Sequence, residues 1–161
     1  DLSACQEEGR AFRTWSARLE GQVTFQNEET LSVVMDAWED WGDGRPLQVR
    51  TADIWTLPDG RPLAKGRCWP ERGERRKLFA QLAEQGEERR KNGGCFLDAD
   101  FAKKLPKALS WHRCARTQEG MEYYIPQGVL AVPVEGVVTF QAPVPKPKVK
   151  RRRKKTLPPT K

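Results

Sequence analysis

The C-terminal segment limits where a folded core can lie in this chain. Residues 143–161 hold nine Lys or Arg and no acidic residue, and prolines interrupt the segment near both of its ends. Such a segment has too few apolar side chains to offset the conformational entropy that is lost on folding. We therefore expect one folded domain over residues 1–142 and a disordered, Lys/Arg-rich tail over residues 143–161.

The tail also accounts for the net charge of the chain. The formal charge is +7, yet residues 1–142 hold 20 basic and 22 acidic residues, a balance of about −2. A flexible cationic run binds polyanions with little sequence preference, because it neutralises phosphates and does not read bases. Anionic lipid, an acidic protein surface and a role in solubility are alternatives. We predict nucleic-acid binding through Lys146, Lys148, Lys150, Arg151, Arg152, Arg153, Lys154 and Lys155.

Membrane insertion and cysteine chemistry are not indicated by the sequence. No stretch reaches the roughly 20 apolar residues of a membrane span, and no apolar signal-peptide core is present. We expect a cytoplasmic protein. Cys5, Cys68, Cys95 and Cys114 are widely spaced and form no Cys-x-x-Cys pair. Ordinary buried thiols are therefore expected, in place of a metal site or a redox centre.

Apolar spacing organises the first half of the body. Phe12, Trp15 and Leu19 lie three and four residues apart, which is typical of a short amphipathic helix. The same spacing runs through LSVVMDAWEDW, so we expect a second helix over residues 31–41, capped by Thr30 and ended by glycines. Strands are expected on either side of it, within GQVTFQN and RPLQVRTADIWTL.

The second half is expected to begin with helices and to end in strands. A helix is predicted from about Glu71 to Arg90, after the turn LPDGRPL, and a shorter helix is predicted to open at Asp98. Tyrosine-rich and valine-rich runs on both sides of TQEG, and again in GVLAVPVEGVVTF, predict strands. The fold class that follows is α/β in a mixed α+β arrangement, as a single domain.

The stretch ERGERRKLFAQL, residues 71–82, is the candidate site of the body. A glycine before a helix start allows a phosphate to approach the backbone, whose first-turn N–H groups can donate to it. Arg75 and Arg76 could bind phosphate oxygens, while Glu74 could hold a metal ion or a water molecule, or act as a base. The alternative is a solvated first helical turn, since acidic side chains are favourable there.

Other side chains could complete such a site. Glu122, on an expected strand, is a second candidate catalytic carboxylate, and Asp98 and Asp100 could ligate a divalent cation. A helix cap and an exposed strand position are the alternatives for these acids. Aromatic side chains could stack on bases, although aromatic residues on strands more often belong to a core. The residues in question are Trp111, Tyr123 and Tyr124.

The order of these elements resembles the ParB/sulfiredoxin superfamily over roughly residues 28–85. Its QPLxVR-like strand is matched by Pro46, Leu47, Val49 and Arg50. Its GERRxRA-like box is matched by Gly73, Glu74, Arg75, Arg76 and Ala80. The sulfiredoxin catalytic cysteine and the ParB helix-turn-helix have no counterpart here, and the lead-in KGRCWPE is charged and contains Pro70. Within the superfamily the chain looks most similar to the plasmid-encoded fertility-inhibition (oncogenic-suppression) proteins.

The resemblance implies a function in bacteria. It suggests a DNA-directed nuclease and/or nucleoside triphosphatase that inhibits conjugative DNA transfer. Gly73, Arg75 and Arg76 would bind ATP or another nucleoside triphosphate, Mg²⁺ would sit on Glu74, and Glu122 would assist catalysis. The alternative is a non-catalytic DNA-binding or protein-docking inhibitor of a transfer machine. The implied partners are DNA and a conjugation coupling protein.

Overall fold

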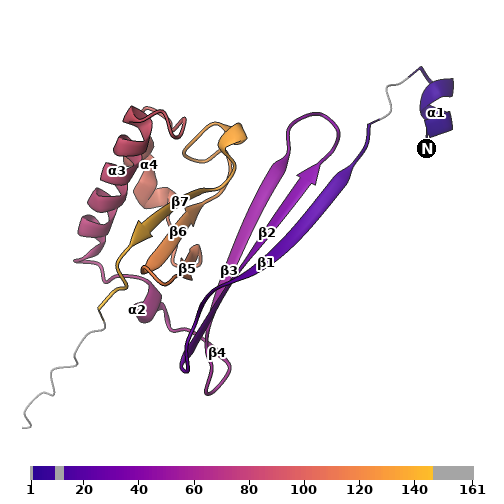
Figure 1. Cartoon of the computed structure of the whole chain (residues 1–161). Helices are drawn as coiled ribbons and strands as arrows, with labels where there is room; N and C mark the ends of the chain where they lie inside the picture. Colours follow the sequence, from indigo (N-terminus) through magenta and orange to yellow (C-terminus); the bar gives the residue numbers. More distant parts are fainter. Residues whose placement is uncertain (1, 10–12, 147–161) are drawn as a thin grey trace, which may run out of the picture.

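Two antiparallel sheets lie side by side, and helices cover one of them (Figure 1). The computed structural model describes residues 2–9 and 13–146. The larger sheet has the strand order β1-β2-β3-β4, and β4 pairs only with the end of β3. A short helix, α1 (Leu2–Glu7), precedes it. The strands are β1 (Ser16–Gln26), β2 (Thr30–Asp40), β3 (Leu47–Thr56) and β4 (Arg61–Pro62).

The second half of the chain forms the smaller sheet and its helices. The strand order is β5-β6-β7, and α3 and α4 lie on the face of this sheet that is turned away from the larger sheet (Figure 1). The fold is thus mixed α+β, as expected, with more sheet than predicted. The elements are α2 (Lys65–Cys68), α3 (Arg75–Lys91), α4 (Phe101–Ala108), β5 (Cys114–Arg116), β6 (Met121–Ile125), the 3-10 turn η1 (Pro133–Glu135) and β7 (Val138–Ala142).

The helix expected over residues 31–41 is wrong, because this segment is strand β2. Apolar side chains occur on both faces of β2: Val34 is buried beneath the sheet, whereas Met35 points to the opposite, outer face. Two alternating apolar sets on one strand imitate the three-and-four spacing of a helix. The helix expected around Leu19 is also wrong, since Leu19 lies within β1, opposite Ala37 of β2.

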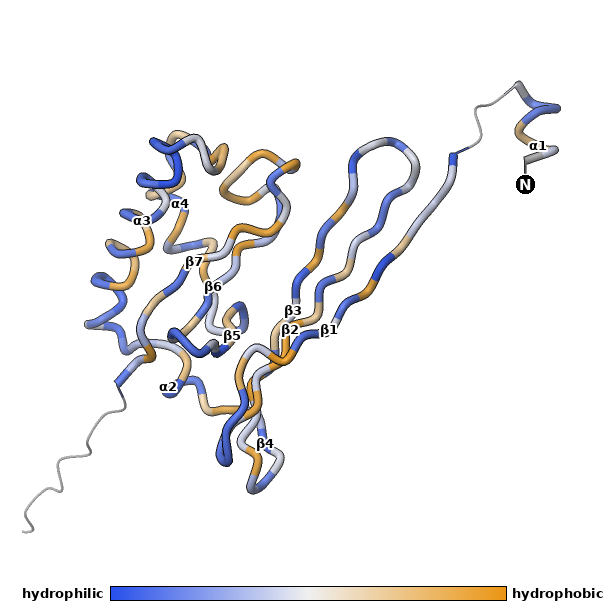
Figure 2. Tube along the Cα trace, viewed as in Figure 1, coloured by the Kyte–Doolittle hydropathy of each residue, from blue (hydrophilic) through white to orange (hydrophobic). Residues whose placement is uncertain are grey.

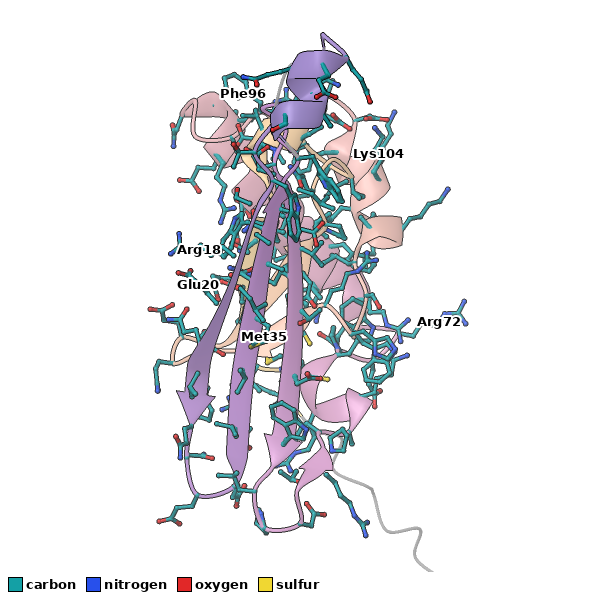
Figure 3. All side chains as sticks on the ribbon, turned by 90° about the vertical axis from the view of Figure 1, so that its right-hand side faces the viewer. Arg18, Glu20, Met35, Arg72, Phe96 and Lys104 are labelled. Carbon is teal, nitrogen blue, oxygen red and sulfur yellow. The ribbon has the colours of Figure 1, made fainter. Side chains whose placement is uncertain are left out.

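The outer face of the large sheet is exposed and partly apolar. Met35 lies at the middle of this face, and the strands around it are left uncovered in the described structure (Figure 3). Figure 2 shows hydrophobic and hydrophilic residues alternating along β1–β3. The exposed apolar side chains of these strands are Leu19, Val23, Met35, Leu47 and Val49.

The hydrophobic core lies between the small sheet and the two longer helices. Leu82 of α3 and Phe101 of α4 are fully buried, as are Tyr123 of β6 and Phe140 of β7. The helix expected over residues 71–90 is confirmed by α3, and α4 confirms the short helix that was expected after Asp98. The strands expected in this half are confirmed by β5, β6 and β7.

Helix α3 also covers the free edge of the small sheet. The Gln85 side chain donates to the Gln141 carbonyl at 2.7 Å and accepts from the Gln141 N–H at 3.2 Å. Arg89 Nη1 donates to the Thr139 carbonyl at 2.5 Å. An uncovered strand edge can pair with other chains, so these side chains replace a missing neighbouring strand.

The contact between the two sheets contains a polar network centred on Arg50 of β3. Its guanidinium donates to both carboxylate oxygens of Asp36, at 2.8 and 2.7 Å, and to Glu122 Oε1 at 2.9 Å. Glu122 also accepts from Gln141 Nε2 at 3.0 Å. The hydrogen bond to Asp36 raises the pKa of Arg50. One arginine thus joins β2, β3 and β6.

Two further observations concern the C-terminal tail and the membrane. Residues 147–161 lie outside the described residues, so the disorder of the tail stays a prediction. Among the residues that the structure describes, no helix is both long enough and apolar enough to cross a membrane.

Candidate nucleic-acid interface

Cationic side chains are concentrated at one end of the molecule. Residues 61–77 hold seven Lys or Arg and two Glu, although residues 1–142 as a whole are slightly acidic. The segment comprises β4, α2 and the first turn of α3. Six of its cations are exposed, and together they form what we call the basic end. These six are Arg61, Lys65, Arg67, Arg72, Arg76 and Lys77.

Three of these six cations form ion pairs among the described residues, including Arg61, whose Nε lies 3.8 Å from Asp59 Oδ2 on an exposed turn. Within the described part of the chain, Arg72 and Arg76 form no ion pair, and Arg72 points away from the body (Figure 3). Lys77 Nζ lies 3.1 Å from Glu74 Oε2, and Arg67 Nη2 lies 3.9 Å from Glu29 Oε2. Both pairs are exposed, and exposed ion pairs contribute only about 0–1 kcal/mol, so a phosphate can displace them.

Two of the seven cations in residues 61–77 lie against aromatic rings. Lys65 Nζ lies 5.4 Å from the ring centre of Trp111, which leaves the ammonium group exposed. Arg75 is different, because it is half-buried: its Nε donates to the Pro70 carbonyl at 3.1 Å and its guanidinium lies 5.9 Å from the Trp69 ring centre. Arg75 therefore fixes the lead-in to α3, and the exposed Arg76 is the better phosphate ligand.

The tail leaves the fold beside the basic end. Lys146, the last described residue, lines a hollow of about 470 Å³ together with Glu71, Glu74 and Lys77 from the start of α3. In Figure 1 the chain leaves the body close to α2. In the sequence, the six consecutive cations that begin at Lys150 follow four residues after Lys146.

The start of α3 offers a ligand mainly side chains, because four of its backbone N–H groups already donate to carbonyl oxygens. The N–H groups of Glu74 and Arg75 both donate to the Glu71 carbonyl, at 2.9 and 3.0 Å, and those of Lys77 and Leu78 donate to the Glu74 carbonyl. Gly73 has no other atom near the position of an added Cβ, so it is not a point of close packing. The geometry favours phosphate contacts through arginine side chains over a backbone cradle.

The expected carboxylate partners do not gather at Glu74. Glu122 faces the large sheet and bonds to Arg50, whereas α3 packs on the opposite face of the small sheet. Asp98 and Asp100 both contact Lys104 Nζ, at 2.7 and 2.9 Å. Among the described residues no three His, Cys, Asp or Glu side chains cluster as metal ligands. Binding of a nucleoside triphosphate and of Mg²⁺ on Glu74 stays a prediction.

The aromatic residues proposed for base stacking belong mainly to the core. Tyr123 is fully buried and its hydroxyl donates to the Cys68 carbonyl at 3.2 Å. Tyr124 is 4% exposed and donates to the His112 carbonyl at 3.3 Å. Trp111, beneath Lys65, remains partly exposed.

Sequence reasoning missed five of the six basic-end residues. It considered only the GERR motif and not the cations on either side of it. The available signal was their density, since seven cations fall within residues 61–77. The near-neutral charge of the body hid this signal. The missed residues are Arg61, Lys65, Arg67, Arg72 and Lys77.

Comparisons with known proteins find two kinds of similarity. The sequence model of the ScoMcrA-like SRA domain matches residues 1–77, which include the large sheet and the basic end. Two crystal structures of DUF3298 family proteins share the fold, and no curated protein matches the chain. One is from Bacteroides fragilis, with a TM-score of 0.60 and 14% identity; the other is from Pseudomonas aeruginosa, with a TM-score of 0.59 and 19% identity.

The relatives of known structure are longer proteins. Each similarity covers 88% of this chain, but only 57% of the Bacteroides chain and 65% of the Pseudomonas chain. At these identities the likeness shows the fold alone. The chain thus corresponds to somewhat more than half of each longer protein.

These findings correct the expected resemblance to the ParB/sulfiredoxin superfamily. The matching family is an SRA domain and the similar structures are DUF3298 proteins. The resemblance required a helix before the PLQVR strand, and that segment is β2, paired along its length with β3. The nuclease, the nucleoside triphosphatase and the inhibition of conjugative transfer by catalysis or docking came only from that resemblance. They are therefore withdrawn, together with the conjugation coupling protein.

Proposed function

We propose that this protein is a DNA-binding module that grips the phosphate backbone with its basic end and its cationic tail. The observation that carries the proposal is the position of Lys146, the last described residue before the tail: it lines the same hollow as Lys77, which belongs to the basic end. Two cationic segments that start from one end can contact one stretch of a polyanion. Because both act through charge, most of the affinity should be independent of sequence.

The likeness to the SRA domain supports a second, finer part of the proposal. SRA-like domains are DNA-binding domains that recognise modified DNA, and the match covers the basic end together with the large sheet. We infer that the body of this protein distinguishes modified from unmodified DNA, while the tail adds affinity. A tail without fixed geometry cannot read a modification, so any discrimination has to come from the folded body.

The first experiment measures the contribution of the basic end. Binding of the full chain to a fluorescent duplex is followed by anisotropy at a series of salt concentrations. Replacing both Arg72→Ala and Arg76→Ala should weaken binding to all sequences by a similar factor. It should also reduce the slope of log K against log salt by about 1 for each phosphate contact that is lost.

A matched control uses the other end of the same helix. Lys91 is also exposed on α3, at its C-terminal end and away from the basic end. Lys91→Ala removes one charge without touching the proposed interface, so its salt slope should equal that of the unaltered protein. An equal loss of slope per charge removed in the two variants would mean that binding follows net charge alone, and it would contradict an interface at the basic end.

The second experiment tests recognition of modified DNA. Two duplexes of identical sequence are compared, one with 5-methylcytosine and one without it, using the chain truncated after Lys146. Tighter binding to the methylated duplex would support discrimination by the body. Equal binding to the two duplexes would show that the body binds DNA but does not recognise 5-methylcytosine.

A further inference from the structure

Two cysteines that are far apart in the sequence meet inside the fold. Cys68 is the last residue of α2 and Cys114 is the first residue of β5. They are 4% and 3% exposed. Cys114 Sγ lies 3.9 Å from the Cys68 carbonyl oxygen and 3.2 Å from that of Trp111, while Cys68 Sγ lies 3.5 Å from the Lys65 carbonyl oxygen.

The surroundings give the two thiols different acidities. A hydrogen bond from Cys114 lowers the pKa of Cys68, and the positive charge of Lys65 acts in the same direction. The same hydrogen bond, together with burial, raises the pKa of Cys114. The thiolate is the reactive form of cysteine, and Cys68 ends the short helix α2, so Cys68 is the candidate nucleophile and Cys114 its candidate partner.

A small oxidant can approach the pair through an open cavity. Cys68 and Cys114 both line a hollow of about 430 Å³, whose wall also includes Asp53, His112 and Tyr124. Helix α2 is four residues long, and a helix of one turn has little stability of its own. Local opening at its end therefore exposes Cys68 at low cost.

We propose that Cys68 and Cys114 form an oxidisable dithiol, in which a peroxide oxidises Cys68 and Cys114 then closes a disulfide. The Cys68 thiol loses its proton, the thiolate attacks one oxygen of hydrogen peroxide and the O–O bond breaks, which leaves a sulfenic acid on Cys68. The departing hydroxide takes up the proton that Cys68 lost and becomes water. Cys114 Sγ next attacks Cys68 Sγ, the S–O bond breaks, and the thiol proton of Cys114 leaves with the hydroxyl as a second water. Two thiols and one peroxide thus yield one disulfide and two waters.

The disulfide would join the basic end to the core. Helix α2 carries Lys65 and Arg67, whereas β5 belongs to the small sheet. A covalent bond from Cys68 to Cys114 would fix this turn against the sheet and prevent its local opening. All four cysteines are free, as expected, and Cys68 and Cys114 are buried. Sequence spacing alone could not indicate that residues 68 and 114 are neighbours.

The test uses the full chain, hydrogen peroxide and peptide mapping. After treatment, the remaining thiols are alkylated and the protein is digested with trypsin. Cleavage after Arg67 and Arg72 releases residues 68–72, and cleavage after Arg113 and Arg116 releases residues 114–116. The expected product is these two short peptides joined, with the loss of two hydrogen atoms, and the linkage disappears on reduction.

Variants of Cys114 assign the order of events. Cys114→Ser keeps a hydrogen-bond donor beside Cys68, and Cys114→Ala removes it. Both variants should lose the linked peptide and accumulate a sulfenic acid on Cys68, which a dione reagent traps. The sulfenic acid should form more slowly in Cys114→Ala, because the thiolate has lost its donor. Cys5→Ala with Cys95→Ala removes the two other thiols and should leave the linkage intact.

Three results would overturn the proposal. The first is the absence of the linked peptide in the treated native chain. The second is trapping of a sulfenic acid on Cys114 in a Cys68→Ser variant at the rate found for Cys68. The third is a linkage of Cys68 only to Cys5 or Cys95, which would make the pairing a consequence of unfolding or of contact between chains. Circular dichroism of each variant confirms that it is folded.

Discussion

At the scale of single residues, Arg50 makes polar contacts that join the two sheets. Its guanidinium contacts two carboxylates, on Asp36 and Glu122, and the three side chains are only 19%, 14% and 18% exposed. The sequence drew attention to two of these residues for other reasons, one as part of the PLQVR strand and one as a catalytic acid. Their partnership spans 72 positions and could not be read from local patterns.

Removing this arginine should destabilise the fold strongly. Arg50→Ala leaves two carboxylates near each other in a largely buried position, and loss of one partner of a buried ion pair costs about 3–5 kcal/mol. We expect the midpoint of urea unfolding to fall accordingly, with an unchanged slope.

An exposed pair provides the comparison. Arg18 and Glu20 also form an ion pair, on the edge strand β1, with side chains 69% and 49% exposed. Arg18→Ala should lower stability by no more than about 1 kcal/mol. Equal midpoints for the two variants would show that the Arg50 network does not hold the sheets together.

At the scale of elements, the contact between α3 and α4 depends on a glycine. Gly86 is buried in the middle of α3, and an added Cβ would lie 2.6 Å from Cζ of Phe101 and 3.1 Å from Cδ1 of Leu97. Glycine is unfavourable in a helix by about 1 kcal/mol relative to alanine. The close approach of α4 thus outweighs the helix preference at this position.

Gly86→Ala should therefore destabilise the protein although it favours the helix. Inserting a methyl group into a packed core costs about 1–3 kcal/mol, more than the gain in helix propensity. The measurement is thermal unfolding of the variant beside Gly73→Ala. Gly73 has open space around it, so that change should stay within about 0.5 kcal/mol of the unaltered protein. A more stable Gly86→Ala variant would contradict the packing of α3 on α4.

At the scale of the whole molecule, the distribution of charge decides the proposed function. The last described residue before the tail, Lys146, lines the same hollow as Lys77 of the basic end. Deleting residues 147–161 should reduce DNA affinity and flatten the salt slope by about 0.9 for each phosphate that the tail neutralises. The remaining binding should still depend on Arg72 and Arg76.

The same deletion should leave the fold unchanged. The buried core ends at Ala142, so the unfolding temperature should not fall when residues 147–161 are removed. Anisotropy and thermal unfolding of the truncated chain provide the two measurements. An unchanged salt slope would show that the tail is not a DNA contact.

The sequence by itself determined the elements whose signals are local. The helix α3, the turn before β4 and the later strands follow from short-range spacing, and the charge of residues 143–161 follows from composition. The strand β2 did not, because its two apolar faces imitate a helix, and only the register with β1 and β3 distinguishes the two. A resemblance built on that wrong element then led to a wrong family and a wrong activity.

Only the tertiary structure decided which distant residues meet. It paired Arg50 with Glu122, brought Cys68 beside Cys114, and placed the exit of the tail next to the basic end. Each of these contacts joins segments that are tens of residues apart, and local sequence preferences contain no information about such distances. The charge of the chain can be counted from its sequence. The packing of the two sheets and α3, however, determines which charged side chains share one surface.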